Sequence, residues 1–381
     1  MPFRCFMNKI KILQFPIANS NGGITHYALN NWKFMDKDCF HCDFATMSKK
    51  IDFENEIIQT GSKIHYISCY AEDNKEQFRY EFEKILDERY DIVHLHTKQW
   101  KSFLVEQICK EKGVKKIIVH AHNAGIDTLD SKKRDLEIKL HEETKRNFTE
   151  KMATDYWACS KKAGEFLFGE QIDKKKIKVM PNAIELDKFA FNSEVRKEYR
   201  RANEMEDYFV IGHIGRFVYQ KNHDFLINVF YELTKEVDNI KLVLLGDGEL
   251  LPEVKRKVKE LKLENDVLFL GHRDDIYNWY SAMDIFCLPS RFEGLPLSMI
   301  EAQASGVCCI ASSEITEEVK ICDNVSFLPL EQCKWKEKIM SLYSEYSLDE
   351  NKREKTPEKL VNAGYNLRDQ VKIIEKEYLG K

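Results

Sequence analysis

The sequence predicts an α/β fold made of two doubly wound, Rossmann-like domains with parallel sheets. Apolar segments short enough for buried strands alternate along the chain with charged segments of helical length, and this alternation predicts parallel strands covered by helices. The length of 381 residues suits two domains better than one. Residues 186–207 are charged and carry few apolar anchors, so we expect a linker there. It would join a first domain over residues 1–185 to a second domain over residues 208–362.

Composition narrows the classes of function. The chain has 59 basic and 63 acidic residues and a formal net charge of −4, which gives no general attraction for nucleic acid. Its eleven cysteines show no pairing rhythm, as expected for reduced thiols. The first residues lack the apolar core of a signal peptide, and no apolar run approaches membrane-spanning length. We therefore expect a cytoplasmic protein.

The first half is expected to form the first parallel sheet. A glycine-rich turn over residues 18–23 follows the first strand, and its adjacent Gly22 and Gly23 allow the backbone to approach a ligand closely. Ser160 is a good N-cap for a later helix. Strands are expected at 9–15, 44–46, 63–67, 92–96, 116–120, 155–159 and 177–182, and helices at 24–32, 78–90, 102–112 and 130–149.

Three histidines, His96, His120 and His122, crowd near the carboxyl ends of two of these strands. His94 and His96 lie on one strand, and His120 and His122 lie at the end of the next. Ligands of doubly wound sheets bind at the carboxyl ends of strands. Each His-x-His pair faces one side of its strand and can chelate a metal, but no acidic partner completes a recognisable ligand set. Hydrogen-bonded histidines of the core or of a ligand cleft are the alternative, and we expect no metal site.

The segment 130–149 is a long, charged helix with two interpretations. It is either a solvated helix or a basic, partly apolar face that rests on anionic lipid. Its basic residues are Lys132, Lys133, Arg134, Lys139, Lys145 and Arg146, and its apolar residues include Leu136, Leu140 and Phe148.

A second series of strands and helices begins at residue 209. Its first strand runs into Gly215, which permits a tight turn, and then into Arg216 and Lys221. A guanidinium grips phosphate oxygens in a bidentate manner and an ammonium acts as a point charge, so this pair can hold a diphosphate. Gly246 stands in a Gly-Asp-Gly turn that is common after such strands. Strands are expected at 209–214, 241–245, 267–270 and 283–288, and helices at 224–237, 251–261, 277–283 and 365–378.

The stretch 290–306 combines a strand end, a loop and a helix start. Glu293 lies in the loop, and Glu301 lies about one turn inside the helix that Pro296 introduces. The first amides of that helix have no intrahelical partner and, with the helix dipole, suit a phosphate. Both carboxylates would repel a phosphate, so they suit hydroxyl groups instead. A ligand with phosphate in the middle and hydroxyls at both ends is a nucleotide sugar.

This pattern resembles the signature of the retaining family-4 glycosyltransferases. Glu293 and Glu301 are separated by seven residues, with Gly-Leu-Pro after the first. The resemblance implies the GT-B fold, in which two Rossmann-like domains face each other across a cleft and a C-terminal helix, here 363–381, packs back on the first domain. Residues 181–185 depart from the family's usual Pro-Asn-Gly-Ile-Asp. The order of motifs that matches the family over residues 209–310 is Arg216 and Lys221, Gly246, Arg273, Glu293 and Glu301.

The resemblance also implies a role for each matching residue. Arg216 and Lys221 neutralise the phosphates of the leaving nucleotide, and Glu293 holds hydroxyls of the donor sugar. His122 orients that sugar, with His120 as the second choice. The remaining donor-binding positions that the family implies are Gly22, Gly23, Gly246, the main chain at Arg273, Gly294, Leu295, Pro296 and, for the ribose diol, Glu301.

The expected function is retaining transfer of a sugar from a nucleotide diphosphate to a hydroxyl of a glycan, without a metal or another cofactor. The resemblance favours a UDP-sugar over a GDP-sugar, a lipid-linked acceptor in polysaccharide biosynthesis, and a cytoplasmic enzyme that can rest on the inner, anionic face of the membrane. Two alternatives stay open: a nucleotide-sugar epimerase of the same fold, and a non-catalytic partner subunit. A dehydrogenase is disfavoured because no Gly-x-Gly-x-x-Gly follows a strand.

Overall fold

The computed structural model describes residues 9–19, 22–345, 353 and 356–380. Residues 1–8 at the amino end, and Ser20 and Asn21 of the glycine-rich turn, therefore lie outside the described residues. The chain divides into two compact units. Unit 1 comprises residues 1–126, 132–182 and 367–381, and unit 2 comprises residues 127–131 and 183–366.

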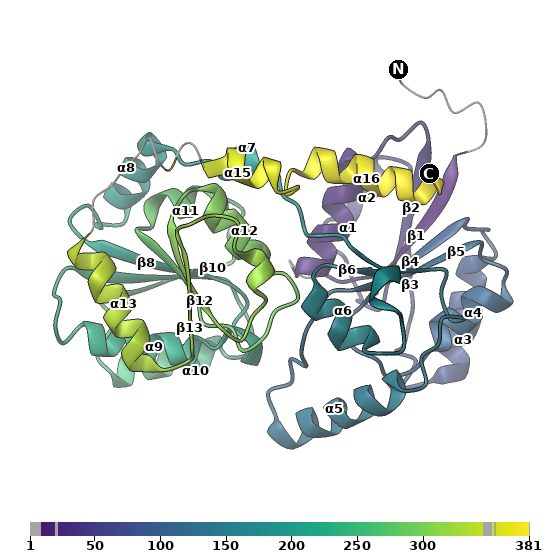
Figure 1. The fold of residues 1–381 in the computed structure, drawn as a ribbon, viewed down its shortest axis with the longest axis horizontal. Helices are drawn as coiled ribbons and strands as arrows, with labels where there is room; N and C mark the ends of the chain where they lie inside the picture. Colours follow the sequence, from purple (N-terminus) through teal and green to yellow (C-terminus); the bar gives the residue numbers. More distant parts are fainter. Residues whose placement is uncertain (1–8, 20–21, 346–352, 354–355, 381) are drawn as a thin grey trace. The chain divides into compact units, whose positions relative to one another are not determined.

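Unit 1 is built on a seven-stranded sheet with the strand order β3-β2-β1-β4-β5-β6-β7 (Figure 1). Every strand pairing in it is parallel. β4 and β5 are buried along almost their whole length, as expected for strands covered on both faces. The strands are β1 (Ile10–Ile17), β2 (Phe40–Thr46), β3 (Ile64–Tyr66), β4 (Ile92–Thr97), β5 (Lys116–Ala121), β6 (Asp155–Ala158) and β7 (Ile177–Val179).

Helices cover both faces of this sheet. One group contains α1 and α16, which pack against each other, and the other contains α3 and α4, as right-handed crossovers in this strand order require. Ser160 accepts a hydrogen bond from the Ala163 amide at 3.1 Å, which confirms it as the N-cap of α6. The helices are α1 (Gly23–Phe34), α2 (Glu54–Ile58), α3 (Lys75–Leu86), α4 (Leu104–Glu111), α5 (Ser131–Lys145), α6 (Lys161–Phe168), the 3-10 turn η1 (Lys174–Lys176) and α16 (Leu367–Leu379).

The last helix, α16, belongs to unit 1 although most of unit 2 precedes it in the sequence. Its Tyr378 is buried and stacks on Trp157, with ring centroids 5.9 Å apart and an interplanar angle of 10°. The Phe40 ring also packs against Tyr378 in an edge-to-face arrangement, with ring centroids 6.2 Å apart. Burying one large apolar side chain stabilises a fold by roughly 2 kcal/mol, so Tyr378 helps to fasten α16 to the sheet.

Unit 2 is built on a six-stranded sheet with the order β10-β9-β8-β11-β12-β13 (Figure 1). All of its pairings are also parallel, so the predicted fold class of two doubly wound parallel sheets is confirmed. The strands are β8 (Phe209–Ile214), β9 (Ile240–Leu245), β10 (Val267–Gly271), β11 (Ile285–Leu288), β12 (Cys308–Ser312) and β13 (Val325–Leu328).

Helices again cover both faces of the sheet in unit 2. α9 packs against α10 and α13, whereas α11 and α12 pack against α7, α8 and α15. A continuous apolar core that includes Leu226, Phe230, Leu242 and Trp335 fills the space between α9, α13 and the sheet. The helices are α7 (Leu186–Phe189), α8 (Ser193–Ala202), α9 (His223–Leu233), α10 (Leu251–Glu260), α11 (Ile276–Ala282), α12 (Leu297–Ala304), α13 (Gln332–Ser344), α15 (Thr356–Asn362) and the 3-10 turns η2 (Tyr219–Lys221) and η3 (Glu317–Val319).

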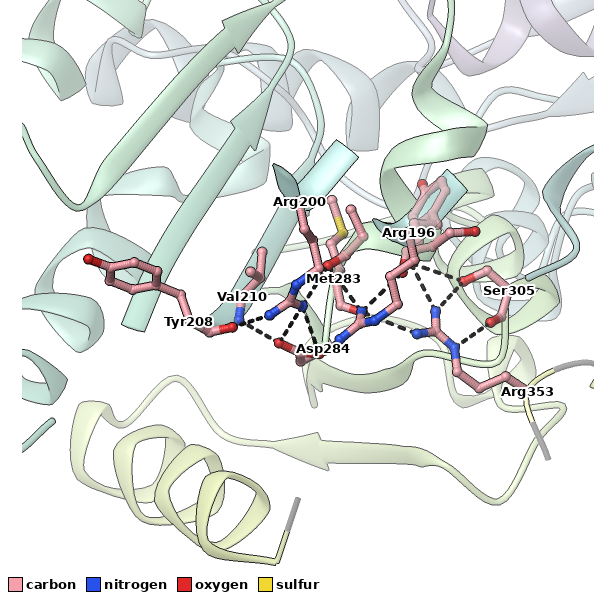
Figure 2. A network of polar contacts seen from close by, with 11 residues as sticks. Arg196, Arg200, Tyr208, Val210, Met283, Asp284, Ser305 and Arg353 are labelled. Atoms are coloured by element: carbon pink, nitrogen blue, oxygen red, sulfur yellow. Dashed lines mark hydrogen bonds and ion pairs between the residues drawn. The ribbon is translucent and has the colours of Figure 1, made fainter. Parts of the chain in front are cut away.

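The segment expected as a linker, 186–207, differs from that expectation because it folds into α7 and α8 of unit 2. Figure 2 shows the reason: Arg196 and Arg200 of α8 converge on Asp284, which precedes β11, at 2.5 and 3.0 Å. Asp284 also accepts a hydrogen bond from the Val210 amide at 2.7 Å. Removing one partner of a buried ion pair typically costs about 3–5 kcal/mol. Two of the charged residues in this segment, Arg196 and Arg200, are therefore buried anchors of unit 2.

Arg353 extends this polar network toward α12 (Figure 2). Its guanidinium donates to the carbonyl oxygens of Ser305, Met283 and Tyr280 at 2.9, 3.2 and 2.9 Å. These carbonyls lie at or just beyond the carboxyl ends of α11 and α12, where helices leave acceptors unsatisfied. A cation at this place also opposes the negative end of each helix dipole.

A surface cavity of about 630 Å³ adjoins the same arginines. It lies near the amino ends of the strands of unit 2, because Phe209 begins β8 and Asn239 and Asp284 immediately precede β9 and β11. Ligands of doubly wound sheets bind at the opposite, carboxyl ends. In the part of the chain that the structure describes, no helix is both long and apolar enough to cross a membrane.

Candidate functional site

The candidate site in unit 2 lies where β8 and β11 meet. These neighbouring strands lead to opposite sides of the sheet, because β9 lies beyond β8 and β12 lies beyond β11. Ligands of open α/β sheets bind at such a switch point, beyond the carboxyl ends of the strands. The loop after β8 carries Arg216 and Lys221, and the loop after β11 carries Glu293.

Gly246 lets two loops of this site approach each other. Its φ of +130° is a conformation that residues with a side chain rarely adopt. A Cβ atom at Gly246 would lie 2.1 Å from the carbonyl oxygen of Gly215. The Gly215 amide donates to Leu245 at 3.0 Å, and the Gly246 amide donates to Gly271 at 2.8 Å. Glycine at position 246 thus lets the turn after β9 pack closely against the segment that carries Arg216.

Lys221 and Glu293 form a preformed ion pair. Lys221 Nζ lies 2.6 Å from Glu293 Oε1, and the Ser290 hydroxyl donates to the same oxygen at 2.8 Å. Gln220 Nε2 donates to the other oxygen, Oε2, at 3.0 Å. Glu293 is only 6% exposed, so its charge is held by these donors rather than by bulk water. The three contacts fix the orientation of the carboxylate.

Asp127 places a second carboxylate against the cationic loop of unit 2. Its Oδ1 accepts a hydrogen bond from the Gln220 amide at 3.0 Å, and its Oδ2 lies 3.5 Å from an Arg216 guanidinium nitrogen. The Arg216 side chain is 46% exposed and that of Asp127 is 19% exposed. A backbone N–H beside a guanidinium is a favourable place for an oxyanion. In this structure, Asp127 supplies that oxyanion.

Glu301 lies inside α12 and contacts Tyr280. The Tyr280 hydroxyl donates to Glu301 Oε2 at 2.7 Å. Burial raises the pKa of the Glu301 carboxyl to about 7, although the Tyr280 hydrogen bond and the Lys221 charge oppose that rise. A carboxyl that titrates near neutral pH can accept hydrogen bonds from hydroxyl groups when it is ionised.

The remaining positions expected in unit 2 lie in the loop before α12 and in the turn after β10. Pro296 is the N-cap of α12 and provides no side-chain cap, and Leu295 before it is buried. Gly294 lies directly after Glu293 in the same loop. The Arg273 side chain is engaged with Asp275 at 2.6 and 2.7 Å, and the expected role of its main chain stays a prediction.

The glycine pair of unit 1 forms the start of α1, beyond the carboxyl end of β1. Gly22 is the N-cap and Gly23 is the first residue of the helix. Gly22 has an ordinary φ of −79°, so its conformation does not require glycine. Among the described residues, a Cβ atom at Gly23 would meet no atom within 4 Å, so their packing does not require glycine at this position.

The four histidines of unit 1 are joined by hydrogen bonds. His94 Nε2 lies 3.1 Å from His120 Nδ1, and His96 Nδ1 lies 2.9 Å from His122 Nε2. His96 Nε2 lies 2.8 Å from the Gln14 side-chain oxygen. His120 is fully buried, whereas His122 is partly exposed. Of the two histidines that the sequence put forward for the cleft, only His122 is thus partly open to solvent.

These histidines are neutral in the folded chain. Burial is the main cause that lowers the pKa of each of the four imidazoles, and that of His96 falls to about 3. His94, His96 and His120 lie close enough to be considered as metal ligands. Their nitrogens are largely engaged already, since among these three only His120 Nε2 is buried without a partner in the described residues.

Several residues of the site were not singled out from the sequence. Each is an ordinary polar residue that becomes notable only through the side chain it contacts in the fold, and most of these contacts join residues far apart in the chain. Tyr378, for instance, lies 284 positions from His94. The residues are Gln14, Asp127, Gln220, Tyr280, Ser290 and Tyr378.

Residues 195–366 match the family model described as glycosyl transferases group 1. The chain is 31% identical over 314 residues to a putative glycosyltransferase, EpsF, of Bacillus subtilis, and the match covers 81% of this chain and 80% of that protein. It is also 31% identical over 232 residues to UDP-Gal:alpha-D-GlcNAc-diphosphoundecaprenol alpha-1,3-galactosyltransferase of Escherichia coli, a match that covers 59% and 58% of the two chains.

The structure is similar to that of Anabaena Alr3699/HepE in complex with UDP and glucose. The TM-score is 0.76, the match covers 97% of this chain and 99% of that chain, and the sequence identity is 17%. At this identity the likeness concerns the fold. Two parallel-sheet α/β domains that match such structures are those of the GT-B fold.

Proposed function

Because the chain belongs to the group 1 glycosyltransferases, we propose that it transfers a sugar from a nucleotide diphosphate to a glycan hydroxyl, with retention and without a metal ion. UDP is the preferred nucleotide, with support from the relative named for a UDP-sugar and the structural neighbour that contains UDP. The relatives named for glycan synthesis support a polysaccharide acceptor.

The observation that carries this proposal is the cationic loop of unit 2. Arg216, the Gln220 amide and Lys221 gather around carboxylates that already occupy the positions of anions. The departing nucleotide diphosphate develops negative charge in the transition state, and preorganised cations and amides lower the energy of that charge. In the proposed mechanism, Arg216 and Lys221 do the work that a divalent cation does in other phosphate sites.

In this proposal, Glu293 and Glu301 accept hydrogen bonds from the hydroxyl groups of the donor. Glu293 is held by Lys221, Ser290 and Gln220 and would accept hydrogen bonds from the sugar. Glu301 would accept hydrogen bonds from the ribose diol, with Tyr280 holding its orientation. No carboxylate is required as a covalent nucleophile, so retention would depend on attack of the acceptor on the face that the leaving group vacates. From unit 1, His122 would orient the donor sugar.

A lipid-linked acceptor is the second part of the proposal. α5 has only His141 buried, and it exposes Leu136, Ile138 and Leu140 by 68%, 43% and 42%. Exposed apolar side chains on a helix with many basic residues favour contact with an anionic membrane surface. Flotation with vesicles that contain anionic lipid should recover the protein, and replacing the basic residues of α5 with glutamine should reduce that recovery.

Nucleotide binding is the first test of the function. UDP should raise the melting temperature more than GDP does, because a ligand that binds only the folded state stabilises it. Proton NMR of a UDP-sugar with and without a lipid-diphosphate glycan then distinguishes transfer from epimerisation, since an epimerase consumes the donor alone. Activity should persist in excess EDTA. Failure to bind any nucleotide diphosphate would reject the proposed function.

A further inference from the structure

The histidines of unit 1 belong to one chain of hydrogen bonds. His96 connects to Gln14 at 2.8 Å, Gln14 to the Tyr378 hydroxyl at 3.1 Å, and that hydroxyl to His94 Nδ1 at 2.7 Å. The two imidazole pairs described above complete the chain at its ends. Its members, in order, are His122, His96, Gln14, Tyr378, His94 and His120.

Gln14 determines the direction of the hydrogen bonds because the oxygen of its side-chain amide can only accept and the nitrogen can only donate. Its Oε1 can only accept, so the hydrogen between Gln14 and His96 must lie on His96 Nε2. A neutral imidazole carries one hydrogen, so His96 Nδ1 has a lone pair and must accept from His122 Nε2. At the other end, Gln14 Nε2 can only donate, and it donates to Tyr378.

Tyr378 can continue the same direction. Its oxygen accepts from Gln14, and its hydrogen can be directed to His94 Nδ1. His94 Nε2 then donates to His120 Nδ1, and the last hydrogen lies on His120 Nε2, which has no partner within the described residues. Gln14 therefore assigns Nε2–H directly to His96 and His122, and this direction of the Tyr378 hydroxyl gives the same tautomer to His94 and His120.

We propose that Gln14 is a positioning residue that fixes His122 as the Nε2–H tautomer, so that His122 Nδ1 acts as a hydrogen-bond acceptor for a hydroxyl group of the sugar donor. The inference rests on the proposed function for the identity of that hydroxyl, but the tautomer follows from the chain alone. Without such a lock, a neutral histidine exchanges between two tautomers, and a fraction of the molecules would present a donor in place of the acceptor.

The surroundings of the chain support a fixed arrangement. Gln14, His94 and His120 are buried, and the ring of Tyr27 lies edge-on against the imidazoles, with centroids 4.9 Å from His120 and 5.2 Å from His122. The desolvation that lowers the histidine pKa values favours neutral imidazoles. Only a neutral imidazole has one donor and one acceptor nitrogen, so only the neutral form can continue a chain of hydrogen bonds in one direction. A buried hydrogen bond also gains strength in a low dielectric.

Long-range proton–nitrogen NMR of the full-length, 15N-histidine-labelled protein tests the tautomer directly. The wild-type spectrum should place hydrogen on Nε2 of His122. Gln14→Leu removes the acceptor for His96, and the His96 and His122 signals should shift to those of mixed tautomers. Hydrogen on His122 Nδ1 in the wild type, or an unchanged His122 in Gln14→Leu, would overturn the proposal.

Two tyrosine variants separate this chain from general effects on folding. Tyr378→Phe interrupts the chain beyond Gln14, so the His94 and His120 signals should change while His122 keeps hydrogen on Nε2. Tyr156→Phe is the matched control, because the Tyr156 hydroxyl in the same unit donates to the Glu150 carbonyl at 2.6 Å and takes no part in the chain. It should change none of the four signals. A change at His122 in Tyr378→Phe would show that Gln14 is not the residue that sets the direction.

Kinetics connect the tautomer to the sugar. Gln14→Leu should lower kcat/KM for the donor roughly tenfold, the order of one neutral hydrogen bond, while leaving UDP affinity unchanged. Mixed tautomers with a wild-type kcat/KM would overturn the role toward the hydroxyl while leaving the proposed function intact. Loss of transfer with every nucleotide sugar in the wild type would instead reject the proposed function, and the NMR result would still decide the tautomer.

Discussion

Unit 2 positions its candidate residues with charge, whereas unit 1 positions its candidate residues with neutral hydrogen bonds. In unit 2, Lys221 lies 2.6 Å from Glu293, and Asp127 lies against Arg216. In unit 1, His122 ends a chain of uncharged side chains that Gln14 orients. Each arrangement lies within its own unit, and each uses partners from distant parts of the sequence.

The difference fits what each region is proposed to bind. Ion pairs can exchange one anion for another, so a phosphate can replace an internal carboxylate without leaving a cation unpaired. A neutral chain has no charge to balance that of an anion, but it presents a donor or an acceptor with a defined direction. We infer that the charged residues of unit 2 stabilise the leaving group and that the oriented hydrogen bonds of unit 1 position the sugar. Three substitutions test the charged side of this comparison.

Removing the Lys221 charge should have the largest effect. Lys221→Ala should reduce transfer by about two to three orders of magnitude, as for other groups that stabilise developing charge. Lys221→Gln should lose as much, although it retains a donor for Glu293. Steady-state transfer assays and circular dichroism provide the measurement, with Lys235→Ala, an exposed lysine paired to Glu232, as the control. Near-normal turnover in Lys221→Gln would show that the charge is not required.

Removing the Glu301 charge should stabilise the protein at neutral pH. Its pKa is raised by burial to about 7, above that of an unfolded glutamate, so the folded state resists ionisation and wild-type stability decreases as the pH rises from about 4 to about 7. Glu301→Gln should therefore raise the free energy of unfolding by up to about 3 kcal/mol at pH 8 and change it little at pH 4. Urea unfolding at both pH values measures this. Equal effects at the two pH values would contradict the assigned cause.

Removing the Asp127 charge should have the smallest effect. Unlike the loss of the Lys221 charge, it should favour the nucleotide, by strengthening its binding. Asp127→Asn takes an internal anion away from Arg216 and the Gln220 amide, so pyrophosphate and UDP should bind more tightly, by several-fold to about tenfold. Calorimetry measures the affinity, and Asp130→Asn in the same segment is the control. Weaker binding in Asp127→Asn would mean that Asp127 supports the nucleotide rather than competes with it.

The sequence was a good guide wherever a pattern was local. The alternation of apolar and charged segments predicted β4, β5, β8, β9 and β10 to within one residue at each end. Short-range rules also identified Ser160 as a helix cap. The sequence also predicted that Arg216 and Lys221 follow the same strand end, and both lie in the segment after β8.

It was a poorer guide wherever a charged residue is buried by a distant partner. The composition of 186–207 indicated a solvated linker, yet Arg196 and Arg200 are buried because Asp284 lies more than eighty positions away. The later elements β13 and α13 were not predicted either, although Trp335 of α13 is fully buried in the core of unit 2. Burial of a mixed segment depends on what packs against it.

The sequence by itself determined the two parallel-sheet units, the cationic loop after β8 and the two glutamates around the start of α12, because periodicity, turns and charge act over a few residues. Only the tertiary structure decided which groups those residues touch: that Lys221 holds Glu293, that Asp127 lies on Arg216, and that Gln14 and Tyr378 stand between the histidines. Hydrogen bonds and ion pairs act over about 3 Å, and residues far apart in the chain reach that distance only through the packing of the sheet and its helices.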